Sequence, residues 1–287
     1  ELAFSAGYLT PAGQEVSAGM VFQLERYEDR RGDGKASLVL YAVDGRQMLL
    51  NWHARQQFRW NAETAEIPVQ SLLQFVLARA GLKLQVISAS DTMADYCPDF
   101  TIHRGDDGIS IIDRLLTFVP DVIFIEGFTV YLLNPQPGDN ATYAYGNKHT
   151  VLKGQYRTGA RETNRVQVTG YAPDSGENII ADGFDWGQIE IMGERPYEMI
   201  DRNLSTALQV VARGQAVLRK TEIFSDAGEI AVPVNCAQQL YDVVEISDAS
   251  AGLTVSKRRI LGISLMYRPE KREYLQNLVQ GCHLQSL

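Results

Sequence analysis

The sequence predicts a mainly β fold that is interrupted by one α+β unit and by one long helix. Apolar and polar residues alternate near the N-terminus, as at Met20, Phe22 and Leu24, and a period of two is typical of strands. Residues 69–80 instead repeat their apolar positions at helical spacing. The chain has 287 residues, enough for two or three domains, and each β block is long enough for a small barrel or sandwich.

A first β domain is expected over residues 1–60. Leu38, Leu40 and Ala42 alternate with other residues in a second strand, after the one that begins at Met20. Residues 28–35 between these strands are charged and contain glycine, which indicates the tip of a hairpin. We expect Asp44-Gly45 to form another turn.

Residues 61–140 are expected to form an inserted α+β domain. Pro68 suits the first turn of a helix and Gly81 its C-terminal end, while Pro120 ends a second helix. Residues 134–140 contain two prolines and a glycine and are interpreted as a linker. The elements expected within the domain are a helix over 69–80, a strand over 84–87, a helix over 109–119 and an apolar hairpin over 122–133.

A second β domain with a helical insertion is expected over residues 141–287. The insertion spans about 193–221, begins at Glu194-Arg195-Pro196, and has Ile200, Leu204 and Leu208 at helical spacing. Seven strands are expected around it, over 151–156, 165–171, 178–181, 188–192, 230–234, 241–247 and 257–267.

The composition excludes several classes of protein. Lys and Arg number 27 against 35 Asp and Glu, a net charge of −8, whereas nucleic-acid binding modules are usually basic. The longest apolar stretch, residues 122–133, is too short to span a bilayer, so we expect no membrane insertion. The three cysteines, Cys97, Cys236 and Cys282, are too far apart for a disulfide scaffold or a two-cysteine zinc knuckle.

No catalytic, cofactor-binding or metal-ligating residue is predicted. The four histidines show no metal-ligand spacing, and no nucleophile motif is present. Residues 32–35 form a hairpin tip without the glycine spacing of a phosphate loop. The histidines are His53, His103, His149 and His283.

Two acidic clusters are interpreted as structural. In residues 105–108, Asp106 and Asp107 precede a predicted helix, where a carboxylate caps the first turn. Residues 182–185, which include Asp182 and Asp185, are expected to form a β-turn between two strands.

Four strand-and-turn phrases occur in order along nearly the whole chain. They are 38–45 with Leu49-Leu50, then 69–82 with 100–102 and 109–116, then 164–170, and finally Asn235 with 240–246 and 259–263. Their order resembles the hub proteins at the end of bacteriophage tails, the baseplate-hub or tail-tip family that is shared with related contractile injection systems. Sixty residues are few for the family's first barrel, and the chain begins at Glu1, so we expect either that the N-terminal strands of this domain lie in a longer gene product or that the first barrel is reduced.

The resemblance implies a structural protein without enzyme activity and without cofactors. Each chain would supply two tube-protein-like antiparallel β-barrels, and a homotrimer would form a ring of pseudo-sixfold symmetry. The ring would join the tail tube to a spike or fibre and let DNA pass through its bore without specific binding. Its partners would be the tail tube protein ring, the distal tail protein and a spike or tail fibre. The protein would belong to the virion and be assembled in the cytoplasm of the host bacterium.

The acidic net charge suits such a bore, because negative charge repels the phosphates of passing DNA. The candidate lining residues are Asp182, Asp185, Glu190 and Asp242.

Two alternatives remain open at this point. Trp52, Trp60 and Trp186, together with tyrosines, would serve a carbohydrate-binding receptor-recognition module if they shared one face. Asp182 and Asp185 would serve a cell-wall hydrolase component if they formed an acid/base pair.

Overall fold

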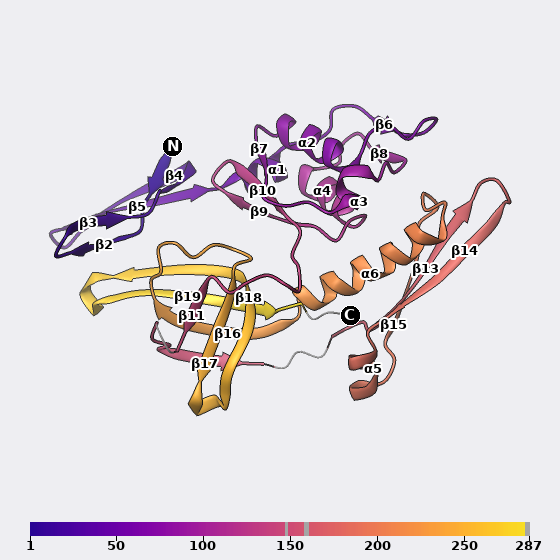
Figure 1. Cartoon of the computed structure of the whole chain (residues 1–287). Helices are drawn as coiled ribbons and strands as arrows, with labels where there is room; N and C mark the ends of the chain where they lie inside the picture. The colour runs from indigo at the N-terminus through magenta and orange to yellow at the C-terminus, as the bar shows by residue number, and fades with distance from the viewer. Residues whose placement is uncertain (147–148, 158–160, 285–287) are drawn as a thin grey trace. The chain divides into compact units, whose positions relative to one another are not determined.

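The computed structural model describes residues 1–146, 149–157 and 161–284 of the chain, which divides into two compact units (Figure 1). Unit 1 is Glu1–Asn134 and unit 2 is Pro135–Leu287. The finer division into domains over 1–60, 61–140 and 141–287 stays a prediction. No helix among the described residues is long and apolar enough to cross a membrane.

The N-terminal part of unit 1 is β structure, as predicted, and it forms open ribbons. β4 pairs with both β1 and β5, and β2 and β3 form a separate hairpin. The segment after β5 is a short helix, α1, because the Asp44 side chain accepts a hydrogen bond from the Arg46 N–H and begins a helical turn. The elements are β1 Leu2–Phe4, β2 Gly7–Thr10, β3 Gly13–Val16, β4 Met20–Gly32, β5 Lys35–Val43 and α1 Gly45–Asn51.

The rest of unit 1 confirms the predicted α+β arrangement. α2 buries its apolar stripe, including Leu72, Leu73 and Val76, and Gly81 follows its end at a positive φ of 82° that favours glycine. β9 and β10 form the predicted hairpin, and β7 pairs with β10 in parallel. The elements are β6 Phe58–Trp60, α2 Val69–Arg79, β7 Lys83–Val86, α3 Asp91–Asp95, β8 Phe100–Ile102, α4 Gly108–Leu116, β9 Val122–Glu126 and β10 Thr129–Leu133.

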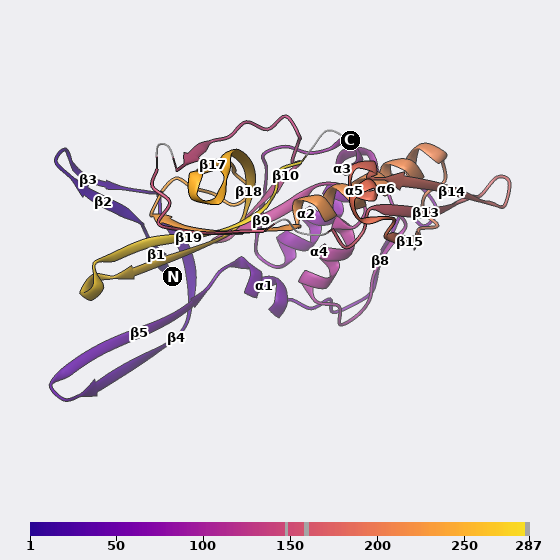
Figure 2. The same cartoon turned by 90° about the horizontal axis from the view of Figure 1, so that it is seen from below.

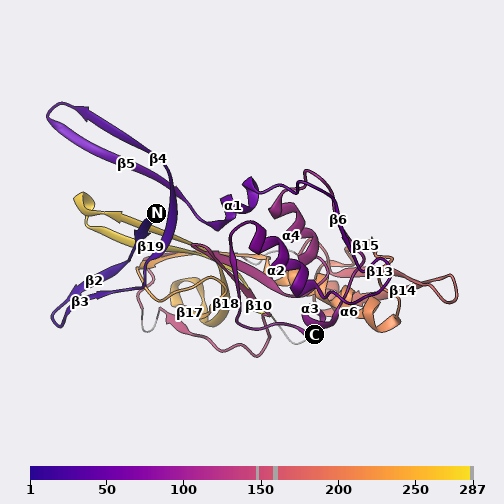
Figure 3. The same cartoon turned by 90° about the horizontal axis from the view of Figure 1, so that it is seen from above.

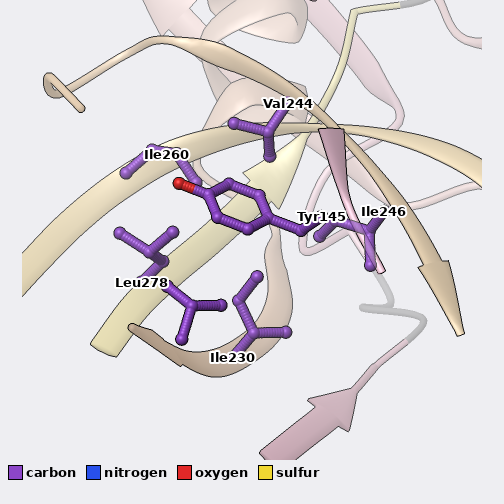
Figure 4. Packing of buried hydrophobic residues seen from close by; sticks show 7 residues of the cluster. Tyr145, Ile230, Val244, Ile246, Ile260 and Leu278 are labelled. Carbon is purple, nitrogen blue, oxygen red and sulfur yellow. The ribbon is translucent and has the colours of Figure 1, made fainter. Parts of the chain in front are cut away.

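Unit 2 contains a six-stranded sheet in the order β11-β17-β18-β19-β16-β12. Its core gathers aliphatic side chains from four strands around the ring of Tyr145, and Ile260 and Leu278 lie in it fully buried (Figure 4). The central strand β19 was missed by the sequence analysis, because its polar residues Gln276 and Gln280 hide the apolar alternation. The strands are β11 Tyr143–Tyr145, β12 Lys153–Tyr156, β16 Asp226–Pro233, β17 Val243–Asp248, β18 Leu253–Arg268 and β19 Glu273–Cys282, with short 3₁₀ turns η1 Ala249–Ala251 and η2 Pro269–Lys271.

A second sheet of unit 2 has the order β14-β13-β15, and helix α6 packs on β13 and β14. Val166 and Val168 of β13 are fully buried, and a Cβ on Gly170 would meet the Leu204 carbonyl oxygen, just before α6, at 2.4 Å and a methyl carbon of Val210 in α6 at 2.7 Å. The close approach of the helix therefore requires glycine at this position. The elements are β13 Arg165–Ala172, β14 Glu177–Phe184, α5 Trp186–Met192, β15 Pro196–Ile200 and α6 Ala207–Ile223.

Two predictions in this region are wrong. Residues 188–192, predicted as a strand, lie in α5, since a short apolar run does not separate strand from helix and Asp185 caps the helix. The predicted helix over 193–221 begins only at Ala207, after a capping box of Thr206 and Gln209. The residues before it form β15, an edge strand that tolerates Pro196.

The two closed barrels implied by the resemblance are not formed by the described residues of the single chain. The strands of the described residues form open sheets, and the largest ends in the short strands β11 and β12. Closing a sheet requires pairing between its first and last strands, which these two strands do not make.

Replacing Leu278 by Ala is expected to destabilise unit 2 by about 2–5 kcal/mol, because it leaves a cavity among packed aliphatic side chains. Val279→Ala, at the next position of β19 with 43% exposure, should cost less than about 1 kcal/mol. Urea unfolding of both variants measures the difference. Equal losses would contradict the proposed position of the core.

Candidate assembly surfaces

The β4–β5 ribbon of unit 1 leaves one of its faces uncovered. Figures 2 and 3 show it running out from α1, with no helix of unit 1 alongside. The pairs Leu24–Ala42 and Tyr27–Leu40 place these side chains on the same face as Leu38. Tyr27 is 67% exposed and Leu38 is 61% exposed, so an apolar stripe faces outward. We call these residues the β5 face.

The opposite face of the same ribbon is charged and satisfied within the chain. Glu28 pairs with Arg30 at 2.6 Å and with Arg26 at 3.5 Å, and Arg26 lies 4.0 Å from the ring centroid of Tyr41. The ribbon is therefore amphipathic around Tyr27 and Leu40, whereas toward its tip Asp29, which pairs with Arg31 at 2.7 Å, lies opposite Leu38 on the apolar face. A two-stranded ribbon is marginally stable alone, so an apolar face that no described residue of unit 1 covers makes this ribbon a candidate assembly surface.

The outer half of the β18–β19 hairpin in unit 2 has the same character. Leu265 and Tyr267 lie on the side of the sheet that carries the buried Leu278, but beyond the core, and Tyr267 is 69% exposed. Tyr267 packs edge to face on Tyr274, with ring centroids 5.7 Å apart. We call these three exposed or half-buried residues, Leu265, Tyr267 and Tyr274, the β18 face.

Both ribbons also offer an unpaired strand edge. β5 is the last strand of its sheet, and β17 pairs with β18 only as far as Arg259. The edge of β18 from Gly262 to Arg268 therefore has no partner strand among the described residues. Long apolar edges promote association with another strand.

The residues of the first acidic cluster have structural roles, as predicted. The Asp107 side chain accepts hydrogen bonds from the N–H and the hydroxyl of Ser110, which cap α4 and lower the pKa of the carboxyl. Asp106 pairs with Arg114 at 3.0 Å and accepts from the His103 N–H. Both carboxylates thus act on local structure.

The second acidic cluster is not the predicted β-turn. Asp182 lies inside β14 and pairs with Arg165 at 2.9 Å. Asp185 caps α5 and forms a buried ion pair with Arg161. The same Arg161 pairs with Glu222 of α6 at 2.7 Å, so one arginine joins α5 to α6.

Three of the four candidate lining residues are therefore engaged with partners inside unit 2, Asp182 through its ion pair with Arg165. Asp185 is buried against Arg161, and the Asp242 carboxylate accepts hydrogen bonds from the Gln238 amide and the Gln239 N–H. Burial raises the pKa of Asp242, although the Gln239 N–H and the nearby Arg259 oppose this. Glu190 is exposed on α5.

The tryptophans do not assemble into one platform within a unit. Trp60 stacks on Phe58 and meets Phe75 edge to face, and Trp52 is half-buried in the same unit. Trp186 of unit 2 stacks on Phe184 and is 61% exposed.

The histidines and cysteines do not gather either. The described residues contain no group of three or more metal-ligating side chains. The cysteines are free, and burial raises the pKa of the Cys97 thiol. In unit 2, His283 Nε2 lies 3.0 Å from the carbonyl oxygen of Pro137, and the ring of His149 lies 5.6 Å from that of Tyr145.

Sequence reasoning identified β5 as a strand but did not identify either assembly face. The alternation of Leu38, Leu40 and Ala42 shows which residues share a face, yet it does not show that nothing in the chain covers them. The apolar residues after Arg259 in β18 could have indicated the β18 face, because this strand is longer than its neighbour β17 and extends beyond it.

Comparison with known proteins places this fold among tail proteins. Three solved structures are similar: a 43 kDa tail protein of prophage MuSo2 from Shewanella oneidensis, a tail protein from Neisseria meningitidis MC58, and the prophage tail protein gp18 from Listeria monocytogenes EGD-e. Their TM-scores are 0.65, 0.65 and 0.53, at 13%, 11% and 12% sequence identity.

The match extends over most of each molecule. It covers 98%, 93% and 94% of this chain and 89%, 82% and 79% of the three structures, respectively. No protein-family model and no curated protein matches the sequence. The chain shares its fold with these three tail proteins. This agrees with the tail-protein part of the resemblance, and the assignment to the hub family in particular stays a prediction.

Removing the Arg161 side chain is expected to destabilise unit 2 by about 3–5 kcal/mol, because Asp185 and Glu222 would stay buried without their cation. Arg165→Ala is the matched control, since Arg165 also holds two carboxylates but its side chain is 30% exposed, so its loss should destabilise unit 2 much less. Thermal or urea unfolding of Arg161→Ala and of the control measures the loss of stability in each variant. A small loss in both variants would show that the buried triad contributes little.

Proposed function

We propose that this protein is a structural component of a bacteriophage tail, and specifically a hub that forms a homotrimeric ring. The similarity of the whole fold to prophage tail proteins supports the tail assignment. The observation that carries the ring is the pair of uncovered ribbons, each with an apolar face and an unpaired edge. An assembly in which neighbouring copies cover these surfaces would prevent the aggregation that exposed apolar edges promote in an isolated chain.

The two edges suit each other in length and chemistry. β5 has nine residues, and the unpaired part of β18 runs from Gly262 to Arg268. Pairing β5 of one copy with β18 of the next would continue a sheet across the contact and join the β5 face to the β18 face. Such a contact is heterologous, and it gives a closed ring when the rotation per copy closes.

Three copies would bring six β blocks around one axis, because each chain has a β block in each unit. This gives the pseudo-sixfold ring that would join a tail tube ring and the distal tail protein to a threefold spike or fibre. DNA would pass through the bore without specific binding. The ring would be part of the virion.

The acidic net charge supports a bore that repels DNA phosphates. Of the four candidate lining residues, the exposed Glu190 suits this role best, because Asp182, Asp185 and Asp242 are engaged with partners inside unit 2. The positions of the acidic groups in caps and ion pairs give no support to an acid/base pair for hydrolysis.

The purified chain is expected to form a ring of three copies with a pseudo-sixfold outline and an open bore. Each chain has a mass of 32.0 kDa, so the trimer is readily separated from the monomer by mass photometry, and negative-stain images give its outline. Particles that stay monomeric at micromolar concentration would count against the ring.

The substitution Leu38→Glu is expected to prevent ring formation, because it places a charge in an interface that must exclude water. The expected loss is at least about 3 kcal/mol per contact, roughly a hundredfold in the association constant. Ser37→Glu is the matched control, since Ser37 is the neighbouring exposed residue on the opposite face of β5.

Each variant chain should fold like the wild-type chain, because both substituted side chains are exposed. Circular dichroism checks this. Mass photometry then separates the outcomes. A Leu38→Glu protein that assembles as well as Ser37→Glu would remove the β5 face from the interface.

A further inference from the structure

Residues 135–142, at the start of unit 2, form a strap that is fastened to the rest of that unit. Within the strap, the Gln136 N–H donates to Asp139 Oδ2 at 2.9 Å, and the Asp139 N–H donates back to the Gln136 carbonyl at 3.2 Å. The Thr142 N–H donates to the Val243 carbonyl of β17 at 2.8 Å. The segment that the sequence predicts as a linker is therefore an ordered strap.

Arginine side chains hold the strap at two points. Arg259 of β18 is almost fully buried and donates to Asp139 Oδ2 at 2.7 Å and to the Tyr241 carbonyl at 2.9 Å. Arg219 of α6 donates to the carbonyl of Pro135. These contacts are charge-assisted, and they do not depend on pH near neutrality because arginine stays protonated.

The third attachment is made by His283, which follows β19. Its Nε2 lies 3.0 Å from the Pro137 carbonyl oxygen, which can only accept, so the neutral ring must carry its proton on Nε2. Among the described residues, its buried Nδ1 has no hydrogen-bond partner. A second proton on Nδ1 would create a buried N–H that none of these residues accepts.

The charges around His283 also oppose a second proton. Arg259 and Lys257, both on β18, are the cations that face it, and Asp139 of the strap is the opposing carboxylate. Lys257 lies across from Glu245 of β17. Burial, followed by Arg259, lowers the pKa of His283 below its ordinary value of 6.5, and the Pro137 carbonyl and Asp139 only partly offset this.

We propose that His283 is an acid-sensitive switch. The neutral side chain holds the strap against the rest of unit 2, and protonation of the imidazole favours dissociation of the strap. The released strap exposes the imidazole to water, where both of its nitrogens are satisfied. Because the pKa is lower when the strap is closed, the released form binds the second proton more readily. Closure is therefore fully favoured above the ordinary value of 6.5 and weakens as the pH falls below it.

Hydrogen–deuterium exchange of the full chain, measured on the backbone amides of the strap, tests this switch. After correction for the intrinsic exchange rate, peptides that cover 135–142 should exchange up to about tenfold faster at pH 5.0 than at pH 7.5. His283→Gln should abolish this acid response, because the glutamine amide donates to Pro137 at both pH values and never becomes charged.

His103→Gln is the control, since His103 is an exposed histidine of unit 1, and this variant should keep the response. Equal protection of the wild-type strap at the two pH values would overturn the proposal. So would an acid response that persists in His283→Gln, because the source would then be Asp139 or another carboxylate. The readout is confined to the strap, and it is independent of whether the chain forms rings.

Discussion

The pairing of β18 with β19 is the interaction on which most of unit 2 depends. β18 is the longest strand, and it pairs with β17 on one side and with β19 on the other. Its inner half carries Ile260 into the core and Arg259 to the opposite face, where the strap lies. Its outer half leaves the core and becomes the β18 face. One hairpin therefore links the core, the strap and a proposed assembly surface.

Buried arginines form the second level of organisation in unit 2. Arg161 joins the cap of α5 to α6, and Arg259 joins β18 to the strap. A buried arginine costs desolvation free energy that only well-placed carboxylates and carbonyls repay. Because these contacts are directional, they require α5, α6, β18 and residues 135–142 to keep defined positions within unit 2.

The parts of the fold that sequence predicted well are those with local signals. The stripe of Leu72, Leu73 and Val76 with Gly81 behind it marks α2, and Asp107 marks the beginning of α4. Predictions failed where local signals conflict, as at residues 188–192, whose apolar pattern suits a strand while Asp185 caps a helix. No catalytic or metal residue was predicted from the sequence, and the acidic clusters lie in caps, strands and ion pairs.

The sequence by itself determined that this is a mainly β protein with an α+β part, because hydrophobic period and turn residues act over a few neighbouring positions. Only the tertiary structure decided which apolar faces are covered. Tyr267 and Leu278 follow the same alternation on the same side of one hairpin, yet Leu278 is buried and Tyr267 is exposed. Burial depends on whether distant segments reach a residue, and that information is not contained in the local pattern.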